Sequence, residues 1–461
     1  MTAIPTPSDT FERVATFSLR RPTDAFPDAV LEAAALMCLD TLGITIGAGP
    51  MDAGRIARDA TVALYGTDRR ETSARMLFDG RRVSLAGAGY AAATQTDNLD
   101  GHDGYNPTKG HIGVVVAPAL AVLSETLEDI PGRDALAALT VGYEVAGRAG
   151  ISLHNTVSDY HTSGAWNALG VVALAARLRG LDDGTLREAL GIAEYHGPRS
   201  QMMREIANPT MLHDGSGWGA LAGLSSVVLA EGGFTGAPAI TVEAPAVAPY
   251  WQDLGDFWHM QHQYVKPYPI CRWAHAAIDA TRALMREHNL VADQIQAIEV
   301  NTFEEAACLF QGMPDDTSKA QYSLPFAVAT VAAYGHIGVE HITGSGLSDP
   351  RVADILGRIS VREAAHHSAR FPVSRFADVV ITTADGQQLA SGDVHARGGP
   401  EHPMDRNEVI EKFMAFASPS IGAARAAAIR DATLGLTREG ARLSDLTALL
   451  FDPPTQAHNG V

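Results

Sequence analysis

Residues 97–119 read DNLDGHDGYNPTKGHIGVVVAPA, and the rest of the chain is organised around them. Three glycines and Pro107 between residues 97 and 111 disfavour a helix there, so the sequence predicts a loop. Small and apolar residues flank it, AGAGYAAATQT before and VVVAPALAVLSE after, which predicts one buried helix on each side. The loop carries six titratable side chains: Asp97, Asp100, His102, Asp103, Lys109 and His111. A solvated acidic loop has no use for two histidines, so a functional site is favoured over a surface turn.

Composition narrows the class of protein. With 461 residues the chain is too long for one core, so two domains are expected. A hydrophobic fraction of 46% is typical of a globular protein. The net charge of −18 argues against a nucleic acid or an anionic membrane surface as partner, because both require a basic face. An anionic substrate stays possible if cations are gathered locally.

The cysteines and the N-terminal residues indicate the cellular compartment. Cys38, Cys271 and Cys308 show no C-x-x-C spacing, which argues against a disulfide framework or a thiolate zinc site. The first ten residues lack a basic region followed by an apolar core, so no secretory signal is predicted. No run approaches the roughly 18 apolar residues that span a bilayer. We expect a cytoplasmic protein without membrane contact.

Periodicity divides the chain into two kinds of structure. From residue 27 to about 250 the pattern is helical and rich in alanine, and no G-x-G-x-x-G follows a strand, which excludes a Rossmann domain. Beyond residue 264, IQAIEVNTF alternates as a strand does, and FADVVITT and QQLASGDV flank the hairpin signal at 384–386. Helical pattern returns at Pro403. The predicted fold is mainly α, with an all-α domain from residues 1–265 and 403–461 and a smaller inserted α+β lid at 266–402.

Four further stretches carry polar groups next to apolar helices. In DYHTSG (159–164), His161 is either functional or an ordinary surface histidine beside an N-cap. PTMLHDGSGWG (209–219) places His213 before a helix whose N-terminus suits a carboxylate, but it lacks the G-K-[ST] of a phosphate loop. A capped turn without ligand is the alternative there. QYSLPF (321–326) is weaker, since its serine is explained as an N-cap.

The fourth stretch, YVKPYPICRWAH at 264–275, contains two prolines that restrict its backbone. Lys266, Arg272 and His275 form a local cationic group at the predicted domain boundary, which an acidic protein needs for an anionic substrate. The alternative is a charged hinge in which Arg272 forms a salt bridge.

The residue types in these stretches point to proton chemistry. His102 and His111 with Asp100 and Asp103 could bind a divalent ion, but no H-x-x-x-H or H-E-x-x-H spacing supports a metal site. The nucleophile pattern G-x-S-x-G is absent from the sequence. Carboxylate and imidazole bases beside ammonium and guanidinium groups suit removal of a proton α to a carboxylate. We therefore expect no metal in this site.

Several motifs, in this order, resemble the MmgE/PrpD family: LDTLG (39–43), the Asp/His loop, VGYEVAGR (141–148), HTSGA (161–165), TMLHDGSGWG (210–219), GFTGAP (233–238), KPYPICRWAH (266–275) and SLPF (323–326). The resemblance implies the two-part fold described above, a homodimer, no cofactor, and a site in the cleft between the domains. Members include 2-methylcitrate dehydratase, cis-aconitate decarboxylase and iminodisuccinate epimerase.

The resemblance also assigns residues. Asp100 matches the first aspartate of the family's D-[FY]-D-D-T loop, His111 the histidine before the apolar helix, His161 the next histidine, and Lys266 the K-P-Y-P lysine. These four are the predicted catalytic residues. The predicted substrate-binding residues are His102, Lys109, His213, Arg272, His275 and Tyr322.

Three positions depart from the family pattern. His102 stands at a family aspartate, Gly104 at a family threonine, and His213 where lysine is common. A histidine-rich site resembles an epimerase acting on iminodisuccinate most closely. A lyase, dehydrating 2-methylcitrate or decarboxylating cis-aconitate, is the alternative, and a dicarboxylate-binding protein without catalysis is the third hypothesis. Near Asp100 and Asp103 a charged His102 is favoured, which would hold a substrate carboxylate, while burial acts against the charge.

Overall fold

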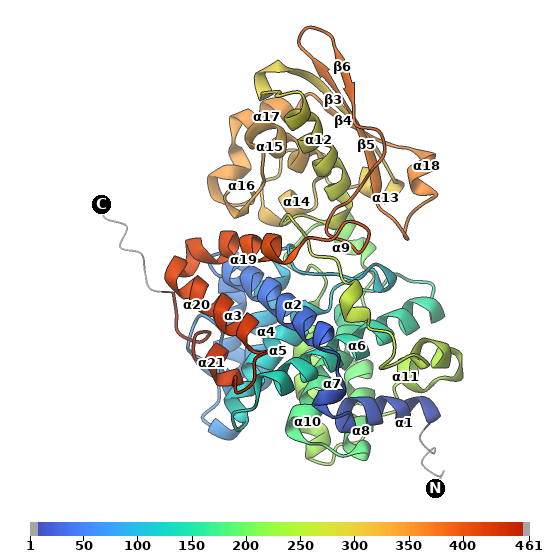
Figure 1. The fold of residues 1–461 in the computed structure, drawn as a ribbon, viewed down its shortest axis with the longest axis vertical. Coiled ribbons are helices and arrows are strands. Elements are labelled where there is room, and N and C mark those ends of the chain that lie inside the picture. Colours follow the sequence, from blue (N-terminus) through green and yellow to red (C-terminus); the bar gives the residue numbers. More distant parts are fainter. Residues whose placement is uncertain (1–7, 455–461) are drawn as a thin grey trace.

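The computed structural model describes residues 8–454, and it is mainly helical, as predicted, with 60% of residues in helices. Figure 1 shows a large helical part, the body (residues 8–265 and 403–454), and a smaller part above it, the lid (residues 266–402). Most of the N-terminal segment in which a secretory signal was sought lies outside the described residues. The long helices of the first part of the body are α2 (Asp28–Gly47), α3 (Asp52–Tyr65), α4 (Leu85–Asp97), α5 (Gly113–Leu123), α6 (Gly132–Thr156), α7 (Gly164–Arg179), α8 (Asp183–His196) and α10 (Ser216–Glu231).

The most apolar helices lie at the centre of the body. Every residue of α5 is buried, and α7 is buried from Gly164 to Ala176. Helices α6 and α7 cross closely because both have glycine at the crossing: a Cβ on Gly170 would lie 2.4 Å from the carbonyl oxygen of Gly142. The loop at 98–112 leaves α4 and enters α5, as the sequence predicts.

Helix α2 corrects one expectation from the sequence. It is long and apolar enough to cross a membrane, with a mean hydropathy of 1.7, although no such run was expected. In the fold, 78% of that apolar window is buried inside the protein, as expected for a helix of the core. It packs against α4, α5, α6 and the C-terminal helix α19 (Arg406–Ile421).

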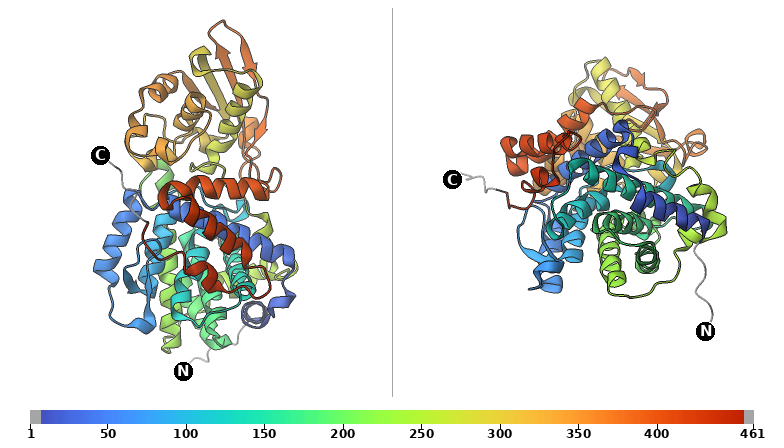
Figure 2. Two further views of the ribbon diagram at one scale, coloured as in Figure 1. Left: turned by 60° about the vertical axis from the view of Figure 1, so that its left-hand side comes forward. Right: turned by 60° about the horizontal axis from the view of Figure 1, so that its bottom comes forward.

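The C-terminal helices return to the body, as predicted. Helices α19 and α20 (Ala423–Gly435) lie beside α2, red next to blue in Figure 2, and α21 (Leu443–Thr447) follows. A capping box starts α19, because Asp405 accepts from the Glu408 amide at 2.9 Å and Glu408 accepts from the Asp405 amide at 2.8 Å. Lys412 of α19 donates to Asp40 of α2 at 2.6 Å, and both side chains are buried. A buried ion pair thus joins a helix from the first part of the chain, α2, to the C-terminal helix α19.

The body is not entirely helical, which corrects the all-α prediction. Strands β1 (Ser73–Arg75) and β2 (Arg82–Ser84) pair antiparallel in a two-stranded ribbon. Three residues per strand are too few to show an alternating pattern in the sequence.

The lid holds a five-stranded mixed sheet in the order β4-β3-β5-β6, with β7 also paired to β5. Strand β3 matches the predicted IQAIEVNT, and β5 pairs with β6 antiparallel across the predicted hairpin. Helices α12 (His275–Glu287) and α15 (Leu324–Tyr334) pack against the sheet (Figure 1). The strands are β3 (Ile295–Thr302), β4 (Ile359–Glu363), β5 (Phe376–Thr383), β6 (Gln388–Ala390) and β7 (Val394–His395).

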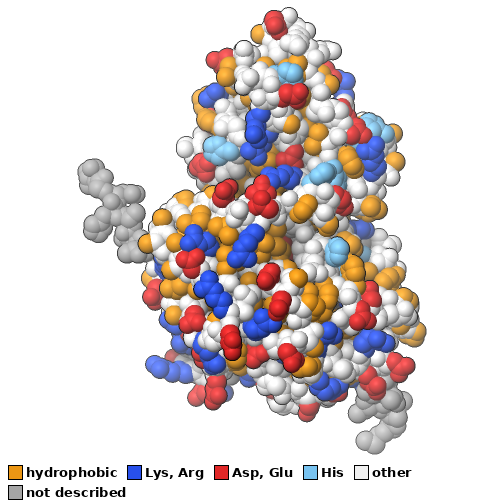
Figure 3. All heavy atoms as spheres, viewed as in Figure 1, with side chains coloured by type: hydrophobic (Ala, Val, Ile, Leu, Met, Phe, Trp, Pro, Cys, Tyr) orange, Lys and Arg blue, Asp and Glu red, His pale blue; other side chains and the backbone are white. Residues whose placement is uncertain are grey.

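The buried apolar side chains form two clusters. One consists of body residues, including Val409 and Phe413 of α19, and the other consists mainly of lid residues with a few from the body, such as Ile44 and Leu99. The two segments that connect the lid to the body lie side by side, because the amide of Val265 donates to the carbonyl of Gly398 at 3.0 Å. The domain boundaries at residues 265 and 403 stay a prediction. On the face shown in Figure 3, acidic and basic side chains are interspersed.

We expect Lys412→Met to destabilise the protein by about 3–5 kcal/mol at pH 7, because it leaves the buried Asp40 carboxylate without its partner. Urea unfolding followed by circular dichroism measures this change. Adding Asp40→Asn should restore part of the loss, while Arg55→Ala, which removes an exposed ion pair with Asp52, should change little. Equal effects of Lys412→Met and Arg55→Ala would contradict the role given to the buried pair.

Candidate active site

A buried ion pair joins the polar loop to the lid boundary. Lys266 donates to the carboxylate of Asp100, and also to the Asp100 carbonyl at 3.2 Å. Lys266 is 1% exposed and Asp100 is 4% exposed. Burial lowers the pKa of Lys266, but the negative charge of Asp100 and the neighbouring Tyr264 and Cys271 outweigh it, and the resulting pKa is raised. Lys266 is therefore an ammonium group held inside the protein.

A second lysine fixes the same loop from the opposite side. Lys412 donates to the carbonyl of Gly101 at 2.6 Å, in addition to its bond with Asp40. The loop is also bound to α5, because Asp103 accepts from the amide of Gly113 at 3.1 Å. Burial raises the pKa of Asp103 to about 7. These bonds hold the loop in one conformation beneath the lid.

His111 is oriented as a neutral base. Its Nδ1 lies 2.6 Å from the carbonyl of Asp103, and since a carbonyl only accepts, this nitrogen carries the proton. Nε2 then carries the free lone pair, and it lies 3.6 Å from Oδ2 of Asp214. Burial first, and then the charge of Lys266, lower the pKa of His111 well below its usual range. The imidazole is consequently uncharged at neutral pH.

His102 packs against His111 edge to face, with ring centroids 4.5 Å apart. Its Nδ1 lies 3.3 Å from the carbonyl of Asp103, and its Nε2 lies 3.6 Å from Asp97. Burial lowers the pKa of His102 well below its usual range, and the charges of His111 and Lys266 act in the same direction. Of the two opposing effects expected from the sequence, burial is therefore the larger, and it favours the neutral imidazole of His102.

Two carboxylates that sequence reasoning left out of the site complete the cluster. Asp214 accepts from the hydroxyl of Ser163 at 2.6 Å and from its amide at 3.2 Å. Asp97 accepts from the amide of Ser216, at the start of α10, at 3.1 Å. The N-terminus of α10, predicted to receive a carboxylate, thus receives one from the protein itself. Burial raises the pKa of Asp214 to about 6.

Arg375 was also missed, because it lies in a segment without a recognisable motif. It is 4% exposed, and its Nη1 donates to the carbonyl of Pro372 at 3.0 Å. Its charge contributes to the lowered pKa of His111 and acts on Tyr264 and Arg272 as well. Arg375 therefore adds a buried cation from the lid to the cluster around Lys266.

Two pockets flank the cluster. One, of about 740 Å³, lies on the body and is lined by Asp97, His213 and Trp218 among others. The other, of about 590 Å³, lies between body and lid, with Met51 on one wall and Leu347 on the other. Asn98, next to the polar loop, lines both. Thr210 and Met211 also line both pockets, so the two pockets share this wall.

Comparison with known proteins identifies the family. Residues 12–248 match the MmgE/PrpD N-terminal domain and residues 268–437 match the MmgE/PrpD C-terminal domain. The chain belongs to the MmgE/PrpD family. It is 22% identical over 477 residues to a cis-aconitate decarboxylase of Aspergillus terreus, covering 93% of this chain and 92% of that protein. A cis-aconitate decarboxylase-like protein of Aspergillus oryzae, oryM, is 22% identical over 389 residues, covering 74% and 77%. As a member of this family, the protein is an enzyme acting on a small carboxylate substrate.

The departure from the family pattern at Gly104 has a steric cause. The backbones of Gly104 and Tyr264 pair through two hydrogen bonds, of 3.0 and 2.8 Å. A Cβ on Gly104 would lie 2.3 Å from the Tyr264 hydroxyl oxygen. The threonine of the family loop does not fit while Tyr264 occupies this place.

The departure at His213 changes a charge. His213 has a left-handed backbone with φ of 46°, and its ring centroid lies 5.5 Å from that of Tyr322. Burial and the charge of Lys266 lower its pKa to about 3. At neutral pH this position is an uncharged imidazole, where lysine is common in the family.

Four predicted residues make their contacts away from Lys266 and Asp100. Arg272 donates to the carbonyls of Ala396 and Arg397 and lies over the ring of Tyr264, and His275 Nε2 is 2.9 Å from the carbonyl of Ile270. His161 is partly exposed, and its ring stacks on His154. The ammonium of Lys109 lies 5.6 Å from the ring centroid of Tyr160. Within residues 8–454 no hydrogen bond links these four to Lys266 or Asp100, and their roles stay predictions.

Replacing His213 by glutamine should change how stability depends on pH. The pKa of His213 is lowered in the folded protein, so the wild type loses stability as pH falls below that of a free histidine, near 6.5. His213→Gln does not titrate, so the stability of the wild type relative to this variant should fall by about 2 kcal/mol between pH 6.5 and 5. Urea unfolding at several pH values measures the difference, with His288→Gln, at an exposed position, as control. A constant difference would show that His213 is not desolvated.

Proposed function

We propose that this enzyme removes a proton from a carbon α to a carboxylate and returns it, without a cofactor, and that its substrate is a small di- or tricarboxylate. Epimerisation of iminodisuccinate is the first candidate. The observation that carries the proposal is the presence, in one buried cluster, of a neutral imidazole at His111 and an ammonium at Lys266. One is poised as a base and the other as an acid.

The reaction needs both groups. His111 Nε2, with its free lone pair, would accept the proton from the α-carbon, leaving the electron pair on an enolate-like carboxylate. Lys266 would give a proton to the opposite face of the same carbon, which inverts its configuration. Inversion requires the two groups to act on opposite faces of the carbon. Arg375 would bind a substrate carboxylate and offset the developing negative charge.

Burial contributes to this chemistry. In a cluster excluded from water, the attraction between an ammonium and an enolate-like oxygen is much stronger than at the surface. The Asp100 carboxylate would keep Lys266 oriented before the substrate enters. Asp214, whose Oδ2 lies 3.6 Å from His111 Nε2, would stabilise the imidazolium once the proton has been taken.

Decarboxylation is the second candidate, favoured by the two Aspergillus relatives named above. In that reaction a carbon–carbon bond breaks, CO₂ leaves with the carboxyl carbon, and the electron pair stays on carbon. Lys266 would then supply the proton and no base would be required. The neutral His213, at a position where lysine is common, removes a cation from the site and favours the epimerase.

Proton exchange separates these candidates. With iminodisuccinate, cis-aconitate or 2-methylcitrate in deuterated water, an epimerase should exchange the α-proton of its substrate without net loss of material. A lyase should instead release CO₂ or water and form a new unsaturated product. Proton NMR distinguishes these results. Binding of all three compounds with neither exchange nor product would support the dicarboxylate-binding hypothesis and overturn the proposal.

We expect Lys266→Met to reduce turnover by at least about 10³-fold, because the variant lacks both the proton donor and the buried positive charge. Near-ultraviolet circular dichroism tests whether the fold is retained. Lys319→Met, on the outer side of α14 (Thr317–Gln321), serves as the matched lysine control and should retain activity. A folded Lys266→Met enzyme with a normal rate would place the chemistry elsewhere.

A further inference from the structure

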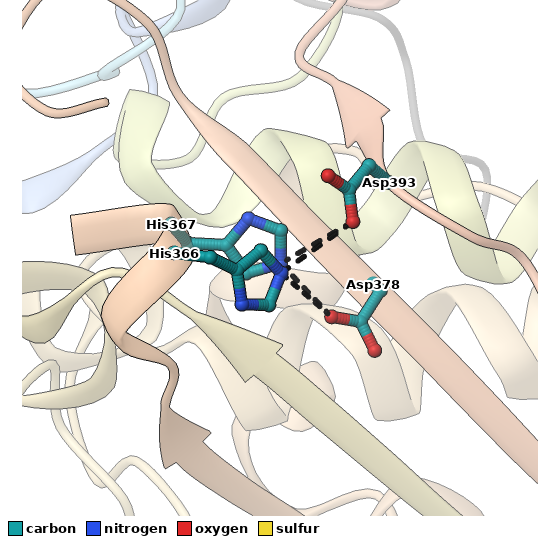
Figure 4. Close-up of side chains that lie close together, drawn as sticks. All are labelled: His366, His367, Asp378 and Asp393. Carbon is teal, nitrogen blue, oxygen red and sulfur yellow. Dashed lines mark hydrogen bonds and ion pairs between the residues drawn. The ribbon is translucent and has the colours of Figure 1, made fainter. Parts of the chain in front are cut away.

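Two histidines and two aspartates of the lid converge on one point. His366 and His367 lie on the short helix α18 (Ala365–Ser368), Asp378 lies on β5, and Asp393 lies just before β7. One nitrogen or oxygen atom of each side chain lies within 4.8 Å of the others (Figure 4). Sequence reasoning did not find this group, because adjacent histidines and two distant aspartates match no known ligand spacing.

The distances suit a small metal ion. His367 Nε2 lies 2.9 Å from Asp378 Oδ2 and 4.0 Å from Asp393 Oδ1, while His366 Nε2 lies 3.9 and 3.5 Å from the same two atoms. Ligand atoms about 2.0–2.2 Å from a tetrahedral Zn²⁺ are separated by roughly 3.3–3.5 Å. The observed separations fall on both sides of that range, so small side-chain movements would bring all four atoms to an ion.

Neighbouring groups hold the outer oxygens of both aspartates. Asn301 of β3 donates to Asp378 Oδ1 at 2.9 Å, and Arg370 pairs with Asp393 Oδ2 at 2.8 Å. The remaining oxygens, Asp378 Oδ2 and Asp393 Oδ1, face the two imidazoles (Figure 4). Groups that orient ligands in this way are typical of metal sites.

Burial and charge also agree with a bound cation. His367 is fully buried, whereas the side chain of His366 is 54% exposed, so an ion could enter from solvent while one side of the site stays fixed. The site contains two carboxylates and one guanidinium, so its net charge is negative. A bound divalent cation would make that net charge positive. Two imidazoles and two carboxylates form a ligand set that Zn²⁺ accepts.

We propose that His366, His367, Asp378 and Asp393 bind one divalent transition-metal ion, with Zn²⁺ as the best match. The site is structural. The ligands lie on both sides of the segment 369–375, which carries Arg375, so the ion would anchor that segment to β5. A second group consists of His336, Glu340 and His341. It has a single carboxylate, and the side chains of His336 and Glu340 are exposed, so it is the weaker candidate for a metal site.

Titration with Co²⁺ and competition by Zn²⁺ test this proposal on the full-length protein after removal of bound metal. The wild type should bind one equivalent of Co²⁺ with the intense visible bands of tetrahedral coordination, and Zn²⁺ should displace it. His366→Ala and Asp393→Asn should each weaken binding at least about 10–100-fold, as loss of a metal contact does. Zn²⁺ should raise the thermal midpoint of the wild type but not of these variants.

His336→Ala is the matched control, since it removes a histidine of the other group, and it should leave binding unchanged. His366 is largely exposed, so His366→Ala is expected to fold, which circular dichroism verifies. The proposal is overturned if the wild type shows no tetrahedral Co²⁺ bands. It is equally overturned if His366→Ala binds as tightly as the wild type, or if His336→Ala removes the signal.

Discussion

The buried attachment of the loop at 98–112 by two lysines is the constraint on which the site depends. Lys266 holds Asp100 from the lid boundary, and Lys412 holds Gly101 and Asp40 from the C-terminal helix α19. A loop rich in glycine has many conformations to lose, and buried charges are costly unless they are paired. The conformation that satisfies both ammonium groups at once is therefore strongly selected. It is also the one that brings His102 and His111 together.

Burial then decides which groups of the cluster carry charge. Lys266 keeps its proton because a carboxylate is in direct contact with it. Carboxylate oxygens of Asp97 and Asp214 lie 3.6 Å from His102 and His111, farther away than a hydrogen bond. The pKa values of His102, His111 and His213 are all lowered, and burial is the first cause in each case. One ammonium among several neutral imidazoles is an arrangement in which acid and base coexist at the same pH.

The sequence predicted what depends on local pattern. Strand β3 lies on the predicted alternating segment, the hairpin of β5 and β6 pairs as expected, and the polar loop lies between two buried helices. It did not predict partners brought together by the fold. Lys412 is 311 residues from Gly101, and its position on α19 resembles any polar position of an amphipathic helix. In DYHTSG, Thr162 or Ser163 was interpreted as an N-cap, although the hydroxyl of Ser163 donates to Asp214.

The departures from the pattern that the family resemblance implies would compensate each other in charge. His102 replaces an aspartate and His213 replaces a lysine, and both imidazoles are neutral in their buried places. One negative and one positive charge are lost together, so the net charge of the cluster is the same as with the family residues. The Lys266–Asp100 pair can then persist unchanged while the groups able to move protons are different. Within one family fold, exchanging a charged pair for two neutral imidazoles is a way to alter proton transfer without altering the binding of an anionic substrate.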